Sequence, residues 1–253
     1  MSIKSKVFAA AAALTLVGGA GAIAATSANA ATPSCGPTCI DIFNHDFGTH
    51  AHPNFVQDTY RQGEKVGQPQ ILFRVANFDP AEDYTFSYQG LVSDFFAANL
   101  VSAAVNLHYG GGATLIPAHG KTPAVMFPDY AAFELQYSPY GVDSGLCSGV
   151  ASTAVAGEGV TLQPCGVTSK TVWIVDSADT VTHGYVPFIN GSDTNFSQPF
   201  VLTYPGSAFP TDKPRPQLYV SNLTGSQGAN GLPFTGTINS SQLFGADLGI
   251  LAP

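Results

Sequence analysis

The chain has 253 residues, with 17 acidic side chains against 9 lysines and arginines, so its formal charge at pH 7 is -8. Negative charge is repelled by phosphate backbones and anionic lipid, which argues against a nucleic acid or a membrane surface as a partner. Charged residues make up only 10% of the chain, whereas 27 glycines and 18 prolines provide for many turns. This composition is typical of an extracellular β protein.

The first thirty residues have the features of a secretion signal. Two lysines precede an apolar run over residues 7–25, and Ala28-Asn29-Ala30 supplies the small residues that a signal peptidase accepts. An uncleaved membrane anchor is the alternative, and the alanine and glycine content of the run argues against it. We expect cleavage after Ala30 and a secreted single domain over residues 31–253. Loss of the two lysines changes the formal charge from -8 to -10.

Branched and aromatic residues predict short strands along most of the mature chain. The expected strands cover residues 39–43, 70–75, 84–88, 133–137, 159–163, 185–190, 200–204 and 217–221, with a final run near Leu243. Prolines between residues 205 and 216 limit the last strands to short or edge positions. The sequence therefore predicts an all-β fold.

One segment departs from this pattern. Apolar residues recur at helical spacing over residues 93–107, Ser93 is suited to cap a helix, and three glycines at 110–112 would end it. The residues that follow are rich in glycine and proline. We expect one short helix within an insertion over about residues 93–130.

Four cysteines in an exported chain predict two disulfides, because the extracellular compartment is oxidising. Proximity in sequence favours Cys35 with Cys39 and Cys147 with Cys165. Four cysteines permit three connectivities, so the pairing stays open at this point.

Three related units can be distinguished along the chain. The middle unit contains Ser144-Gly145-Leu146-Cys147, then Val160-Thr161-Leu162-Gln163-Pro164-Cys165, then Thr171-Val172-Trp173. The first contains Cys39-Ile40-Asp41-Ile42 and Gln70-Ile71-Leu72, and the third contains Phe188-Ile189-Asn190, Pro216-Gln217-Leu218-Tyr219 and Gln242-Leu243-Phe244.

This spacing resembles the ricin-type β-trefoil, whose units carry Cys-Leu-Asp-Val, a Val-Gln-Leu-Trp-like strand ending in Cys, and Gln-x-Trp. The resemblance covers nearly all of the mature chain apart from the insertion. It implies a β-trefoil-like fold, with a β-sandwich as the alternative. The chain also resembles small secreted proteins of filamentous actinobacteria.

The resemblance implies one sugar site per unit, built from an aspartate, a glutamine and an aromatic residue. No unit of this chain keeps the whole set. The first unit has Asp41 and Gln70 but lacks the aromatic residue, and the middle unit has none of the set. The third retains Gln217, Tyr219 and Gln242 without the aspartate, so it is the expected ligand site.

The densest polar cluster contains His45, His50 and His52 together with Asp41 and Asp46. Imidazoles beside carboxylates are suited to zinc or copper, although a surface loop without metal explains the same residues. Asp143-Ser144-Gly145 occurs once, as a turn, and no aspartic-protease partner accompanies it. No esterase or phosphate-loop motif is present in the sequence.

We therefore expect a secreted, non-catalytic binding module for a glycan or an extracellular protein surface, without a cofactor. One alternative is a secreted hydrolase or metal-dependent enzyme that uses residues 41–52. Another is a structural protein of the cell envelope. The oligomeric state stays open.

Overall fold

The computed structural model describes residues 39–49, 52–53, 55–74, 84–111, 130–175, 184–206, 208–225 and 237–248. These residues all belong to one compact unit, Thr32–Pro253. The expected signal segment, Cys35, His50 and residues 112–129 lie outside the described residues.

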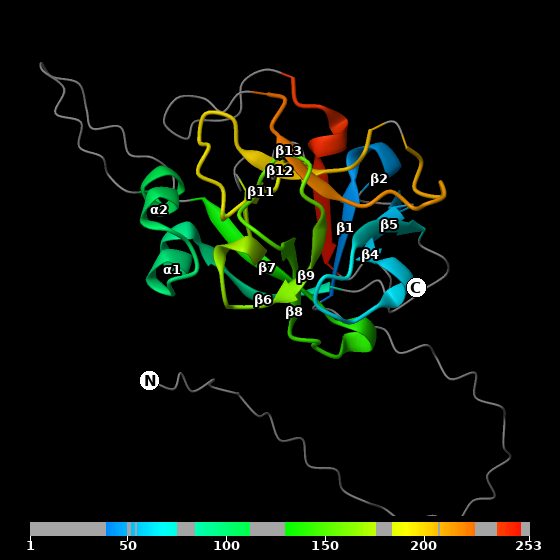
Figure 1. Ribbon diagram of the computed structural model, residues 1–253, viewed down its shortest axis with the longest axis horizontal. Helices are drawn as coiled ribbons and strands as arrows, with labels where there is room; N and C mark the ends of the chain where they lie inside the picture. Colours follow the sequence, from blue (N-terminus) through cyan, green and yellow to red (C-terminus); the bar gives the residue numbers. More distant parts are fainter. Residues whose placement is uncertain are drawn as a thin grey trace, which may run out of the picture. The chain divides into compact units, whose positions relative to one another are not determined.

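Six strands form a closed antiparallel ring (Figure 1). In order around the ring they are β1 (Ile40–Asn44), β6 (Tyr84–Leu91), β7 (Ala131–Tyr137), β10 (Val172–Val175), β11 (Ile189–Asn190) and β14 (Phe244–Leu248). The segment before β11 meets β14 at the bridge between Val186 and Phe244, and β14 then pairs with all of β1. The ring therefore has no open edge.

Three hairpins cap the ring. They are β4 (Phe55–Thr59) with β5 (Gln70–Arg74), β8 (Leu146–Val150) with β9 (Val160–Pro164), and β12 (Phe200–Thr203) with β13 (Tyr219–Asn222). Isolated bridges join each hairpin region to the other two, through Pro69 and Thr161, Ile71 and Gln217, and Gly159 and Tyr219. A six-strand ring capped by three hairpins is a β-trefoil. The all-β prediction is confirmed, and closure of the ring excludes the sandwich.

Each of the three units contributes two ring strands and the hairpin between them. The first and third units begin at β1 and β11, as the sequence predicts. The middle unit begins at β7, so the alignment of Ser144–Cys147 with the opening strand is wrong, because these residues lead into β8, the second strand. The alignment followed Cys147, and this cysteine belongs to the hairpin. The ricin-type assignment itself stays a prediction.

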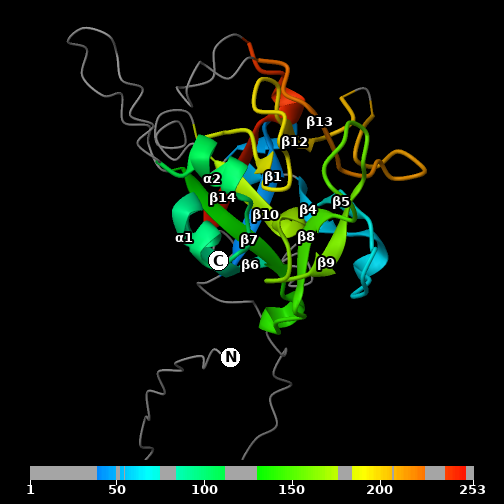
Figure 2. The ribbon, with the colours of Figure 1, turned by 60° about the vertical axis from the view of Figure 1, so that its left-hand side comes forward.

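The helical segment between the first and second units contains two short helices, α1 (Val92–Ala97) and α2 (Ala103–Tyr109), so the single helix expected over 93–107 is wrong (Figure 2). Asn99 adopts a left-handed conformation with φ 62° and ends the first helix. The Ser102 hydroxyl then accepts a hydrogen bond from the Val105 amide and caps the second. A proposed cap at Ser93 is also wrong, since α1 begins one residue earlier.

The core inside the ring takes apolar residues from every unit. Trp173 is fully buried among them, and its indole nitrogen donates to the Ser148 carbonyl at 3.0 Å. Ile40, Leu135 and Phe244 belong to the same cluster. A second cluster joins the helices to the outer face of β10, with Phe95 packed in the same group as Ile174. Neither helix approaches the length of a bilayer-spanning segment, and the described part of the chain contains no other candidate span.

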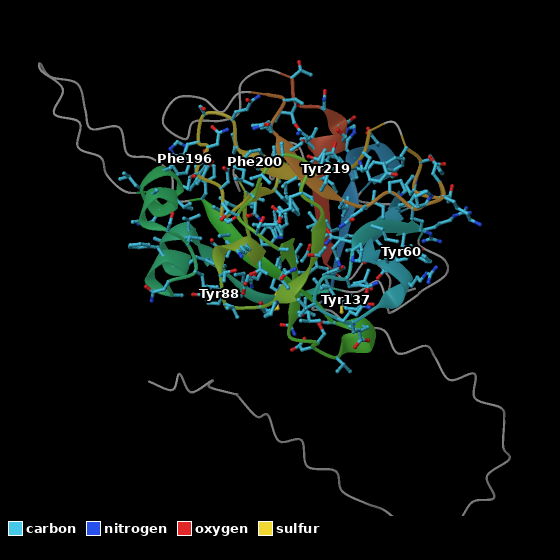
Figure 3. All side chains as sticks on the ribbon, viewed as in Figure 1. Tyr60, Tyr88, Tyr137, Phe196, Phe200 and Tyr219 are labelled. Carbon is cyan, nitrogen blue, oxygen red and sulfur yellow. A yellow bond between two sulfur atoms is a disulfide. The ribbon has the colours of Figure 1, made fainter. Side chains whose placement is uncertain are left out.

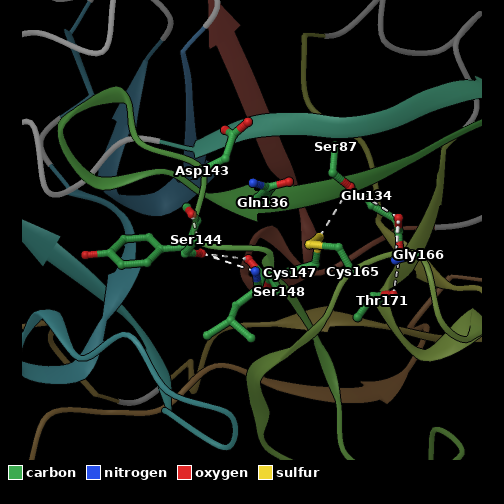
Figure 4. Close-up of a disulfide and its surroundings, with 12 residues drawn as sticks. Ser87, Glu134, Gln136, Asp143, Ser144, Cys147, Ser148, Cys165, Gly166 and Thr171 are labelled. Atoms are coloured by element: carbon green, nitrogen blue, oxygen red, sulfur yellow. Dashed lines mark hydrogen bonds between the residues drawn. A yellow bond between two sulfur atoms is a disulfide. The ribbon is translucent and has the colours of Figure 1, made fainter. Parts of the chain in front are cut away.

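Cys147 and Cys165 form a disulfide across the β8–β9 hairpin, which confirms that prediction (Figure 4). The chain beyond this bridge is held by the buried carboxylate of Glu134, which is 1% exposed and accepts hydrogen bonds from the Gly166 amide and the Thr171 hydroxyl. Cys39 is also disulfide-bonded. Its expected partner, Cys35, is outside the described residues, so that pairing stays a prediction.

Replacing both Cys147 and Cys165 by alanine removes the constraint on the unfolded chain that the bridge imposes. We expect the free energy of unfolding to fall by about 3 kcal/mol, the chain-entropy value for a loop of this size. Urea denaturation without reductant measures the change against the parent protein. An unchanged denaturation midpoint with an unchanged slope would contradict it.

Candidate ligand groove

Gln242, one of the residues expected to bind sugar, is buried in the protein. It is 2% exposed. Its side-chain oxygen accepts from the amide and hydroxyl of Thr224, and its nitrogen donates to the Ser221 hydroxyl and the Asn222 carbonyl. These bonds tie the segment before β14 to β13. In this conformation Gln242 supports the hairpin and presents no polar atom to a surface ligand.

Gln70 and Asp41 are buried as well, 0% and 4% exposed. The Gln70 side-chain oxygen accepts from the Gln57 amide nitrogen at 3.1 Å and from the Tyr84 hydroxyl. Asp41 lies on β1, one of the ring strands, between the core residues Ile40 and Ile42. The structure therefore does not bring these two residues to a surface where a saccharide could reach them.

Gln217 and Tyr219 retain part of their surface. Both lie at the third hairpin, and Figure 3 marks Tyr219 there. The Gln217 amide nitrogen donates to the Val160 carbonyl at 3.0 Å. It passes so close to Gly159 that a Cβ at this position would lie 2.4 Å from the amide nitrogen, so a larger residue at position 159 would displace the Gln217 side chain. Two of the five expected ligand residues are thus accessible.

The histidines predicted to bind metal are only partly described. His45 is half-exposed, with its Nδ1 atom 3.6 Å from an Asp46 oxygen and its ring centroid 4.8 Å from that of Tyr185. His50 and the side chain of His52 lie outside the described residues. Within the described part, no three His, Cys, Asp or Glu side chains are grouped closely enough to hold a metal ion. The metal site stays a prediction.

An open groove of about 590 Å³ lies where the first hairpin meets the loop that leads into β13. No motif in the sequence indicates this groove. Its lining residues are two aromatic residues, three cations and a proline, namely Tyr60, Phe73, Arg61, Lys213, Arg215 and Pro214. Figure 3 shows Tyr60 at this end of the first hairpin.

One wall of the groove follows from strand register. The bridge between Ile71 and Gln217 is antiparallel, so the residues two positions beyond it on either side, Phe73 and Arg215, face each other. The Arg215 guanidinium carbon lies 4.3 Å from the centroid of the Phe73 ring. This separation is a cation–π contact, which holds the guanidinium over the Phe73 ring.

The opposite wall is formed by the short helical turn Tyr60–Gln62. The Tyr60 amide donates to the Pro69 carbonyl at 2.8 Å, which closes the loop between β4 and β5. Arg61 has φ 57° and ψ 29°, and its guanidinium carbon lies 5.1 Å from the Tyr60 ring centroid. A left-handed conformation costs a residue with a Cβ roughly 1–2 kcal/mol, so this arginine occupies a strained position.

The loop that carries Lys213 and Arg215 is anchored on the first unit by aromatic contacts. The Phe209 ring lies 5.6 Å from that of Phe55 and 5.8 Å from that of Phe47. The Asp212 carboxylate accepts from the Phe209 amide at 2.7 Å. Burial, and to a smaller extent Asp212, raises the pKa of the Tyr204 hydroxyl beside Phe47, so this buried phenol stays neutral.

The groove concentrates positive charge in an acidic protein. Two of the nine basic residues, Lys4 and Lys6, belong to the expected signal segment, and three of the remaining seven line this one groove. No described carboxylate lies within 4.0 Å of a basic nitrogen of Arg61, Lys213 or Arg215. Their donors therefore face the groove without an acidic partner from the described chain.

No family model matches the chain, and no curated protein matches its sequence. Among solved structures, the chain is similar to a designed three-fold symmetric protein, ThreeFoil, at 11% identity and a TM-score of 0.46, covering 83% of this chain and 99% of that one. It is also similar to an exo-β-1,3-galactanase from Clostridium thermocellum at 9% identity and a TM-score of 0.45. That match covers 83% of this chain and 30% of the galactanase. The fold assignment rests on the strand pairing described above.

The strain at Arg61 predicts a difference between two variants that both remove its side chain and charge. Arg61→Gly relieves the left-handed conformation, whereas Arg61→Ala keeps the Cβ that causes the strain. We expect the glycine variant to be the more stable by about 1 kcal/mol, measured by chemical denaturation. An alanine variant of equal or greater stability would show that Arg61 is not strained.

Proposed function

We propose that the protein is a secreted, non-catalytic binding module that binds a saccharide in the groove. The observation that carries this proposal is the set of three cations, which have no ion-pair partner among the described residues, and two aromatic rings around one open groove. Hydrogen-bond donors fixed on rings are suited to ligands that present many oxygen acceptors. A saccharide is such a ligand.

The size of the groove supports the same proposal. Pockets of 300–1,000 Å³ generally enclose a small-molecule ligand, and about 590 Å³ leaves room for a short stretch of a sugar chain. The groove is open to solvent, so a longer chain can extend beyond it. Gln217 is only two residues from Arg215, and both Gln217 and Tyr219 keep part of their surface exposed.

The residues that line the groove favour binding over catalysis. Hydrolysis of a glycosidic bond usually requires a pair of carboxylates, and proton transfer near neutral pH most often uses a histidine or a carboxylate. The six lining residues include neither type of side chain. The groove therefore has donors that can hold a saccharide and no obvious acid–base pair to cleave one.

A glycan array with both neutral and acidic glycans tests this proposal on the mature protein, residues 31–253. We expect specific binding that falls at least tenfold in Arg215→Ala, because this change removes the donor held over Phe73. Arg74→Gln is the matched control. Arg74 is the exposed neighbour of Phe73, does not line the groove, and should be replaceable without loss.

Two results would contradict the proposal. The first is a blank array for folded, disulfide-intact protein. The second is binding that Arg215→Ala and Arg74→Gln reduce equally, since that would mean that net charge and not the groove determines affinity.

A further inference from the structure

We infer that the groove selects an acidic polysaccharide whose negative charge is carried by uronate carboxylates. This inference rests on the proposed function and narrows its ligand class. Two observations support it: the positive charge of the groove, and the contacts between its aromatic rings and its arginines.

The contrast in charge is large. The mature chain has a formal charge of -10, so most of its surface repels anions. The groove gathers Arg61, Lys213 and Arg215, and the described residues place no carboxylate in ion-pair contact with them. Repulsion between neighbouring like charges destabilises a fold, and the carboxylates of a ligand would offset that repulsion. An anion is therefore the ligand that gains most from this site.

The aromatic rings support the same assignment. A neutral sugar is usually held by stacking its apolar face on an open aromatic ring. Here the Arg215 guanidinium carbon lies 4.3 Å from the centroid of the Phe73 ring, and the Arg61 guanidinium carbon lies 5.1 Å from the centroid of the Tyr60 ring. The rings act as supports for cations. A guanidinium placed over a ring keeps its N–H groups available, and these can pair with a carboxylate through two parallel hydrogen bonds.

The number of cations favours a chain with repeated charges over a single small anion. Two guanidinium groups come from different hairpin regions, and Lys213 adds a third charge beside one of them. An oligouronate presents one carboxylate per sugar ring and can meet these cations in succession. Nucleic acid also repeats its charge, but its tight binding relies on extended basic surfaces, and the remaining basic residues of this chain lie outside the groove.

Isothermal titration calorimetry with the mature protein tests the inference. The probes are tetragalacturonate, the neutral tetrasaccharide obtained by reducing its carboxylates to alcohols, a sulfated tetrasaccharide and a tetranucleotide. We expect tetragalacturonate to bind at least tenfold more tightly than each of the others. Its affinity should also fall steeply between 50 and about 300 mM salt, because charges at an open groove are screened.

Variants assign the effect to the groove. Arg61→Gln combined with Arg215→Gln should abolish measurable binding of tetragalacturonate, whereas Arg74→Gln should change it less than about twofold, as expected for exposed charge outside the site. Arg215→Lys keeps the charge and loses the planar fork, so it should weaken binding while preserving the salt dependence. Thermal unfolding of each variant identifies any loss that comes from misfolding, and the Lys variant keeps the test decisive if the double variant does not fold.

The outcomes separate the two proposals. Equal binding of the neutral and acidic tetrasaccharides would overturn the inference and leave the saccharide module intact. Preference for the sulfated probe would overturn the assignment to carboxylates. Equal or tighter binding of the tetranucleotide would overturn a saccharide as the ligand, and binding of none of the probes, with a blank glycan array, would overturn both.

Discussion

The ladder between β1 and β14 is the interaction on which the rest of the structure depends. It joins the first and the last strand of the described chain and so closes the ring. On its other side, β14 is held to the third unit by the single bridge between Val186 and Phe244. Closure fixes the third unit beside the first. The bridge between Ile71 and Gln217 can form only in this arrangement, and it determines that Arg215 lies over Phe73. The groove is thus a consequence of closure, built from segments more than 130 residues apart in a sequence of 253.

Rigid supports on both sides distinguish the groove from an ordinary charged surface. On one side the strained turn at Arg61 is held by the bond from Tyr60 to Pro69. On the other, Phe209 packs the cationic loop against the first unit. Long basic side chains lose conformational entropy when a ligand orders them. Contact with aromatic rings already orders the arginines in the free protein, so less entropy is lost on binding. The structure therefore combines charge with preorganisation.

Much of the fold could be predicted from the sequence, because strand patterns and cysteines are local signals. Cys147 and Cys165 pair as expected, although following Cys147 placed the start of the middle unit one strand too late. The helix was predicted without the left-handed turn at Asn99, since helical spacing continues across it. The site was harder to find. Burial of Gln242 depends on tertiary contacts, and the aromatic and basic residues of the groove come together only through barrel closure.

The proposed ligand site is the groove at the junction of the first and third units. Backbone amide NMR of residues 31–253 during titration with tetragalacturonate locates the bound ligand on the fold. We expect the largest shift changes to cluster at residues 60–62, 73 and 213–217, with little change in the β8–β9 hairpin. Saturable shifts confined to that hairpin or to residues 44–49, with the groove unaffected, would contradict it.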